Sequence, residues 1–197
     1  MMAKDPTIEC DLAIIGCGLS GMAAALFASE RGISTVQTGI SGGTIFASGY
    51  LDLMGVHPIE AGKRWTDPWA AIDALSVDIP EHPYARLKKE TIKKALEKVV
   101  SFLRDHGLTY LNRGETNSEA MTTLGTSKPT YYVPGTMWEG VRALEEKPPC
   151  LIVGFHELND FSAAQIAKTY GSTWPDLHWQ KVSLQGNKTP MSLVSGD

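Results

Sequence analysis

One short segment constrains the fold of this chain more than any other: residues 16–21, which read GCGLSG. The apolar run at residues 10–15 precedes it and predicts a buried parallel strand, while residues 19–31 are rich in good helix formers. Gly32 predicts a left-handed stop for this helix, and residues 33–38 predict a second strand. A strand, a glycine turn, a helix and a strand in close succession predict one Rossmann-type βαβ unit.

Each glycine of residues 16–21 has a physical task in such a unit. Gly16 allows the tight turn, Gly18 lets the backbone approach a phosphate, and Gly21 lets the helix pack against the strand. The N–H groups and partial positive charge of the helix N-terminus then attract the phosphate. Cys17 is expected to fill the turn, with a reactive thiol as the alternative. The sequence therefore predicts a phosphate site on Gly16, Cys17, Gly18, Ser20 and Gly21.

The end of the second strand lacks the acid that dinucleotide sites use to hold the adenosine ribose. Its place falls at Thr38 or Gly39, yet residues 36–40 include no carboxylate, and Gln37 offers only a weaker substitute. Asp52 is the nearest later acid. Ordinary NAD binding is therefore disfavoured, whereas a mononucleotide such as FMN has no adenosine ribose and does not need the acid.

A second glycine-rich segment lies at residues 39–49, just beyond the second strand. In open α/β sheets this edge binds ligands. Its glycines allow close backbone approach, and its hydroxyl groups are hydrogen-bond donors. We expect it to run beside the phosphate or ring of the cofactor through Gly42, Gly43, Thr44, Ser48 and Gly49, with a loop that binds nothing as the alternative.

The middle of the chain predicts helices and short extended segments. Asp67 is expected to cap a helix that starts at Pro68, and residues 86–106 have the apolar spacing of an amphipathic helix ended by Gly107. Residues 108–135 are expected to be extended, with 121–123 pairing with 130–133, and residues 136–146 to form a short helix.

The last part predicts a second, weaker βαβ-like unit without a glycine-rich phosphate signature. It consists of a strand at residues 150–154, a helix at 161–170 between Asp160 and Gly171, and a strand at 179–184.

The predicted fold class is therefore α/β: a Rossmann-like parallel sheet with an N-terminal βαβ flavin-binding unit, incomplete, plus a second smaller α/β segment. The expected domains are a βαβ unit with its phosphate loop, a helical and extended cap region, and an α/β segment that continues in the full-length protein. They span residues 1–57, 58–147 and 148–197.

Composition excludes several classes of function. The net charge of −4 gives no broad attraction to nucleic acid. The three cysteines and five scattered histidines fit neither a disulfide framework nor a metal site. The apolar run at residues 12–28 follows acidic residues and is short for a membrane span, so we expect a cytoplasmic protein without direct membrane insertion. No catalytic acid or base can be named.

Several stretches resemble one flavoprotein family, the B subunits of anaerobic glycerol-3-phosphate dehydrogenase, which are related to the fumarate reductase group. They are IIGCGLSG at 14–21, FASGYLDL at 46–53, HPY at 82–84, LGT at 124–126, and IVG at 152–154 with Asp160 and Phe161. The resemblance implies a subunit that relays electrons while glycerol 3-phosphate is oxidised to dihydroxyacetone phosphate and quinone is reduced. It also implies FMN, with FAD as the alternative.

The same resemblance implies partners and a location. The partners are a larger FAD-containing catalytic subunit and an iron–sulfur subunit that anchors the complex at the inner face of the cell membrane. Family members continue well past Asp197, so these residues alone are expected to be inactive. Two alternatives stay open: another FAD-dependent oxidoreductase of the fumarate reductase type, and a truncated assembly module that binds no cofactor.

Overall fold

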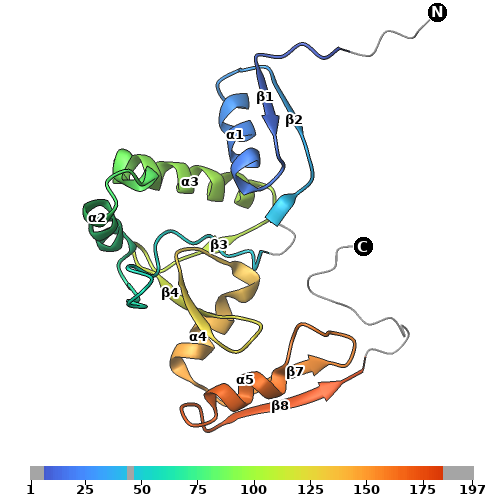
Figure 1. Cartoon of the computed structure of the whole chain (residues 1–197). Helices are drawn as coiled ribbons and strands as arrows, with labels where there is room; N and C mark the ends of the chain where they lie inside the picture. Colours follow the sequence, from blue (N-terminus) through green and yellow to red (C-terminus); the bar gives the residue numbers. More distant parts are fainter. Residues whose placement is uncertain (1–6, 44–46, 184–197) are drawn as a thin grey trace, which may run out of the picture. The chain divides into compact units, whose positions relative to one another are not determined.

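The computed structural model describes residues 7–43 and 47–183. It divides the chain into two compact units, which we call the N-terminal unit (residues 1–47) and the C-terminal unit (residues 48–197) (Figure 1). The α/β fold class is confirmed, and the expected domain boundaries at residues 57 and 147 stay predictions.

The N-terminal unit is the predicted βαβ unit. Strand β1 spans Leu12–Ile15, helix α1 spans Leu19–Ser29 and strand β2 spans Thr35–Thr38. The strands are parallel, with Leu12 opposite Thr35 and Ile15 opposite Thr38. The glycine turn therefore leads directly from the carboxyl end of β1 into α1, as the sequence predicts.

Gly32 ends α1 as expected. It has a left-handed φ of +69°, which a residue without a Cβ adopts readily. Its N–H donates to the Ser29 carbonyl at 2.9 Å, and the N–H of Ile33 donates to the Ala28 carbonyl at 3.1 Å. This pair of bonds is a Schellman motif, which satisfies the last carbonyls of the helix and turns the chain toward β2.

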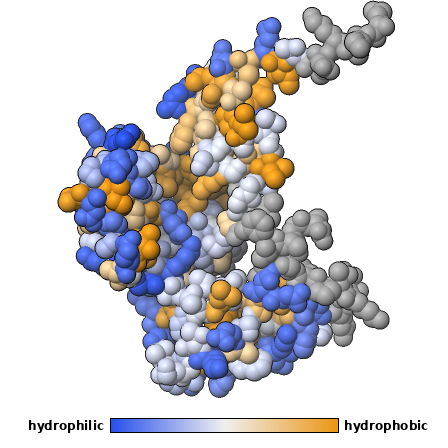
Figure 2. All heavy atoms as spheres, viewed as in Figure 1, coloured by the Kyte–Doolittle hydropathy of each residue, from blue (hydrophilic) through white to orange (hydrophobic). Residues whose placement is uncertain are grey.

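The N-terminal unit buries little apolar surface. Among its described residues, Ala28 is the one buried hydrophobic residue, whereas Ile15 is 90% exposed and Leu19 is 51% exposed. Figure 2 shows apolar surface, in orange, over this part of the chain. The two strands alone thus provide no enclosed core.

The C-terminal unit begins with the predicted helices. Helix α2 spans Pro68–Asp78, and the Asp67 carboxylate caps it by accepting from the N–H groups of Trp69 at 2.9 Å and Ala70 at 3.1 Å. Helix α3 spans Lys89–Asp105 and starts three residues later than expected. Helix α3 starts later than expected because a separate 3-10 helix, η2, occupies Pro83–Arg86.

The largest core of the C-terminal unit lies between these helices and the following strands. It contains Leu53, Trp69, Ile72, Ile92 and Tyr131. The rings of Trp69 and Tyr131 meet edge to face, with centroids 5.8 Å apart and planes at 86°. This contact between aromatic rings holds the chain at Tyr131 against helix α2.

The predicted hairpin forms, but its expected register is wrong. Strand β4 spans Ser118–Met121 and strand β5 spans Ser127–Thr130, antiparallel with Met121 opposite Ser127. The register moves because Tyr131 and Val133 are buried elsewhere, at 2% and 0% exposure. Val133 pairs with Leu111, in strands β6 (Val133–Pro134) and β3 (Tyr110–Leu111).

The second α/β segment is confirmed at the end of the C-terminal unit. A 3-10 helix η3 at Gly135–Met137 leads into α4 at Trp138–Glu146, followed by β7 at Cys150–Phe155, α5 at Ala163–Tyr170 and β8 at Leu177–Val182. Strands β7 and β8 are parallel, and α5 packs on them (Figure 1).

The N-cap that the sequence predicts for α5 is wrong. The cap of α5 is Ser162, whose Oγ accepts from the N–H of Gln165 at 3.2 Å, and not Asp160. A serine hydroxyl next to the first helical residue reaches the third N–H of the helix, which a side chain further upstream cannot do. Among the described residues, each sheet has two strands, and no helix is long and apolar enough to cross a membrane.

Candidate functional site

The candidate site is the turn between β1 and α1. The N–H of Gly16 donates to the Thr38 carbonyl at 2.7 Å, and the N–H of Cys17 donates to the Ile40 carbonyl at 3.2 Å. These bonds continue the β1–β2 pairing beyond the strands. The turn and the start of the second glycine-rich segment are therefore held together at the carboxyl ends of the two strands.

Gly21 is required by close packing of the helix on the turn. A Cβ atom at this position would lie 2.1 Å from the Gly16 carbonyl oxygen, a distance that no side chain tolerates. The backbone of Gly16 has a φ of +117°, which favours glycine. These two glycines have the structural tasks that the sequence assigned to them.

Gly18 differs from the other two because its surroundings are open. It is the N-cap of α1, with φ −73° and ψ 177°, which any residue can adopt. A Cβ there would meet the Ser41 carbonyl oxygen at 3.9 Å, an ordinary contact. Folding of the turn therefore does not require a glycine at this position, whereas close approach of a ligand to the backbone does.

The N-terminus of α1 has the features of an anion-binding site. No side chain caps it among the described residues, and its first turn carries no acidic residue. The first N–H groups of a helix lack partners within the helix, and they carry the positive end of its dipole. Ser20 lies exposed in this turn and adds a hydroxyl group. A phosphate is the kind of group that such a terminus binds.

Cys17 has a structural contact. Its Sγ donates to the Gly39 carbonyl oxygen at 3.2 Å, which links the turn to the residue after β2. This bond favours the expectation of a small residue filling the turn over that of a reactive thiol. The Gln37 side chain is also engaged, because its Nε2 donates to the Gly16 carbonyl at 2.9 Å.

Gly39 is the residue of this site whose importance the sequence reasoning missed. Its φ is +134°, and a Cβ there would crowd Gly16, at 3.0 Å from Cα and 3.1 Å from N. The position where dinucleotide sites often carry an acid is thus occupied by a backbone pressed against the turn. The signal for this in the sequence was a glycine immediately after the predicted second strand.

The second glycine-rich segment is described only in part. Gly42 has a positive φ of +55° and lies with Gly43 in the N-terminal unit, whereas Ser48 and Gly49 belong to the C-terminal unit. The Gly49 carbonyl accepts from the Tyr110 hydroxyl at 2.8 Å. The expected site residue Thr44 lies outside the described residues.

Two of the stretches that carry the family resemblance, residues 46–53 and 82–84, come together in the C-terminal unit. The Tyr84 hydroxyl donates to the Leu53 carbonyl at 3.4 Å, so the HPY stretch contacts the end of the 46–53 stretch. Burial raises the pKa of Tyr84. The Lys128 ammonium pairs with Asp52 at 2.7 Å and lies over the Tyr50 ring, 5.1 Å from its centroid. These contacts make this region part of the scaffold.

Comparisons with known proteins agree with the geometry of the turn. The family described as FAD binding domain matches residues 11–170, which is most of the chain. No solved structure matches. The matched region starts just before β1 and includes the whole glycine turn.

Curated relatives point to a more specific group. The chain is 35% identical over 123 residues to a protein of Vibrio vulnificus (strain YJ016) named as the B subunit of anaerobic glycerol-3-phosphate dehydrogenase, covering 61% of this chain and 28% of the relative. It is 32% identical over 162 residues to a Halobacterium salinarum (strain ATCC 29341 / DSM 671 / R1) protein named as the probable B subunit of the same enzyme, covering 81% of this chain and 36% of the relative. The chain thus spans about a third of the length of these relatives.

Proposed function

The chain belongs to the FAD binding domain family, and from this premise we propose that its glycine turn holds the phosphate of a flavin in an oxidoreductase subunit. The observation that carries the proposal is the contrast between Gly18 and Gly21. Gly21 is explained by packing, whereas Gly18 faces open space at an uncapped helix N-terminus. A phosphate in that space accounts for a glycine that the fold alone does not require.

The proposed binding residues have separate roles. Backbone N–H groups at the start of α1 donate to the phosphate, and the Ser20 hydroxyl adds a further donor. Gly16, Cys17 and Gly21 shape the turn, while Gly42, Gly43, Thr44, Ser48 and Gly49 are proposed to border the rest of the cofactor. When bound, the flavin supplies the redox chemistry.

Two observations bear on the type of flavin, and they favour different flavins. The family description names FAD. The crowded backbone at Gly39 leaves no room for a side chain at that position, and the other candidate position, Thr38, carries no carboxylate, which favours FMN. We propose a flavin without an acid-held adenosine, with FMN as the simplest form.

The wider activity is proposed from the named relatives. We infer a subunit that relays electrons during anaerobic oxidation of glycerol 3-phosphate to dihydroxyacetone phosphate, with quinone as the acceptor. Its partners would be a FAD-containing catalytic subunit and an iron–sulfur subunit that holds the complex at the cytoplasmic face of the membrane. The names of the relatives support a multi-subunit enzyme.

Gly18→Ala tests the cofactor site without disturbing the fold. The variant places a methyl group where the phosphate is proposed to lie, while within the described residues the methyl meets one atom, the Ser41 carbonyl oxygen, at an ordinary distance. We expect flavin affinity to fall at least about tenfold, because hydrogen bonds to a charged group contribute roughly 1.5–3 kcal/mol each. Fluorescence titration of the full chain with FMN and FAD measures the change and ranks the two flavins.

Gly140→Ala is the matched control, since a Cβ there meets no atom of residues 7–43 and 47–183 within 4 Å and the residue lies in α4. It should leave flavin affinity unchanged. If wild type binds neither flavin, the cofactor proposal fails and the assembly module remains. If flavin binds but neither partner subunit co-purifies with the tagged full chain from its own cells, only the proposed complex fails.

A further inference from the structure

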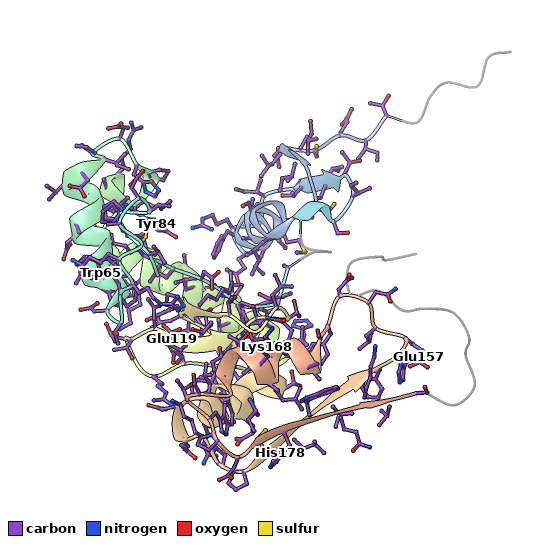
Figure 3. The ribbon with its side chains drawn as sticks, turned by 60° about the horizontal axis from the view of Figure 1, so that its bottom comes forward. Trp65, Tyr84, Glu119, Glu157, Lys168 and His178 are labelled. Carbon is purple, nitrogen blue, oxygen red and sulfur yellow. The ribbon has the colours of Figure 1, made fainter. Side chains whose placement is uncertain are left out.

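The side chain of Gln37 joins strand β2 to the glycine turn. Its Nε2 donates to the Gly16 carbonyl oxygen at 2.9 Å, and the residue is half-buried. Because a carbonyl can only accept, the atom of the carboxamide that faces it must be the nitrogen. Helix α1 lies along both strands of this unit (Figures 1 and 3), so the two strands, the turn and the helix are all close to this contact.

The Gly16 carbonyl receives its hydrogen bond from this side chain and not from the sheet. In a regular parallel ladder, a carbonyl at this place would accept from a backbone N–H of the neighbouring strand. Gly16 has a φ of +117°, and the next bond runs from the Cys17 N–H to the Ile40 carbonyl. Within residues 7–43 and 47–183, no backbone N–H donates to the Gly16 carbonyl, so the Gln37 amide satisfies it.

The peptide group between Gly16 and Cys17 is therefore held at both ends. Its carbonyl accepts from Gln37, and its N–H donates to the Ile40 carbonyl at 3.2 Å. Because a peptide group is planar, two bonds on opposite sides fix its orientation. The next residue, Gly18, is the N-cap of α1, so this orientation determines where the first N–H groups of the helix point.

The same carboxamide also lies against the helix. A Cβ atom at Gly21 would be 3.1 Å from Gln37 Nε2 and 2.1 Å from the Gly16 carbonyl oxygen. The amide and the carbonyl thus face the first turn of α1 together. Gln37 contacts both the turn and the helix, which are the two parts proposed to hold the phosphate.

We infer that Gln37 is a positioning residue of the flavin site, which acts on the cofactor phosphate through the Gly16 carbonyl. This inference rests on the proposed function, since it needs a phosphate at the start of α1. Without the amide, the peptide after Gly16 loses one of its two anchors. The N–H groups of the turn are then less ordered before binding, and ordering them weakens the affinity.

Gln37→Met tests this role because it removes the amide and keeps the length of the side chain. Fluorescence titration of the full chain with FMN, FAD and riboflavin measures three affinities. FMN and FAD should lose affinity by the same factor of about five, which is the usual effect of one neutral hydrogen bond. Riboflavin has no phosphate, so its affinity should change by less than about twofold.

The comparison of FMN with FAD separates support of the turn from contact with a ribose. A carboxamide that bonded the adenosine ribose would affect FAD alone. A carboxamide that orients the turn affects every flavin that carries a phosphate.

Thr35→Val is the matched control on the same strand. The Thr35 hydroxyl donates to the Ile33 carbonyl at 2.9 Å, so this variant also removes one side-chain hydrogen bond of β2. It leaves the bond between Gln37 and Gly16 in place. Its affinities for all three flavins should equal those of the wild type.

Gln37→Glu adds a dependence on pH that identifies the bond itself. An ionised carboxylate has no proton to donate to the Gly16 carbonyl, whereas a protonated carboxyl group donates one. The FMN affinity of this variant, divided by that of the wild type, should therefore rise as pH falls from about 8 to about 5. Taking this ratio at each pH removes the titration of the phosphate, and helical circular dichroism shows that the unit stays folded.

Four outcomes overturn the inference while the wild type still binds flavin. They are full FMN affinity in Gln37→Met, a loss confined to FAD, an equal loss for riboflavin, and a ratio in Gln37→Glu that does not change with pH. An equal loss for riboflavin would assign Gln37 to folding of the whole unit. If the wild type binds neither FMN nor FAD, the proposed function fails, and the inference fails with it.

Discussion

The backbone conformation of Gly39 limits which residue types can occupy the position after β2. Its left-handed backbone lies against Gly16, and its carbonyl accepts from the Cys17 thiol. Any side chain placed there disturbs the turn before it can reach a ligand. The absence of an acid at this position is therefore a consequence of the backbone path.

Gly39→Asp tests whether the backbone path excludes the acid. Supplying the missing carboxylate should lower the free energy of unfolding by about 1–3 kcal/mol, because a residue with a side chain is strained at this φ. Affinity for FAD should not improve. Chemical denaturation followed by circular dichroism measures the loss, and a stable variant with tighter FAD binding would contradict the crowding argument.

Tyr84 is expected to make stability depend on pH in the alkaline range. Burial raises its pKa above the ordinary value of 10.0, so the folded state holds the phenolic proton more tightly than the unfolded state. Its contribution is therefore complete below pH 10 and is lost as pH rises through the higher folded pKa. Tyr84→Phe should flatten the decline in unfolding free energy between about pH 9 and pH 11. Parallel curves for variant and wild type would contradict this assignment.

At the residue scale, the sequence predicted the glycines of the turn but not every contact that the residues around the turn make. The tasks of Gly16 and Gly21 follow from general rules for a strand–turn–helix, and the structure confirms both. The contacts of Gly39, Gln37 and Cys17 join residues about twenty positions apart. Such contacts depend on the exact parallel register, which no local pattern specifies.

At the scale of elements, capping explains which helix limits were predictable. Asp67 and Pro68 stand next to each other and define the start of α2, as expected. Helix α3 begins after Lys88, which provides no side-chain cap, so its start was not marked in the sequence. The hairpin register was not predicted correctly, because it depends on the burial of Tyr131 and Val133 and not on the residues of the turn.

Two substitutions at these caps should have opposite effects. Asp67→Ala removes the acceptor for two N–H groups and should lower the unfolding free energy by about 1 kcal/mol. Lys88→Asp supplies an acceptor at an uncapped start and a favourable charge for the helix dipole, and should raise it by about 0.5–1 kcal/mol. Denaturant titration of both variants measures the difference, and equal signs would refute the cap assignments.

At the scale of the whole molecule, the two units have different optical reporters. All tryptophans lie in the C-terminal unit, where Trp69 and Trp174 are buried. Helix α1 contributes to circular dichroism but has no tryptophan beside it in its own unit. Unfolding of the N-terminal unit is therefore invisible to tryptophan fluorescence unless the C-terminal unit responds.

Gly21→Val uses this difference. The added side chain collides with the Gly16 carbonyl and should unfold the βαβ unit. We expect loss of helical circular dichroism and of flavin binding, with the thermal midpoint of tryptophan fluorescence unchanged. A fluorescence midpoint that falls by several degrees would show that the two units unfold together.

The small core of the N-terminal unit has a consequence for how the proposed flavin would bind. With Ala28 as its buried hydrophobic residue among those described, the unit has little free energy of its own to keep the turn in shape. Any flavin that binds the ordered turn shifts the balance toward it by mass action. If the flavin binds this turn as proposed, loading and folding of this unit are coupled, and a higher concentration of free flavin raises the fraction of chains that present an ordered βαβ unit.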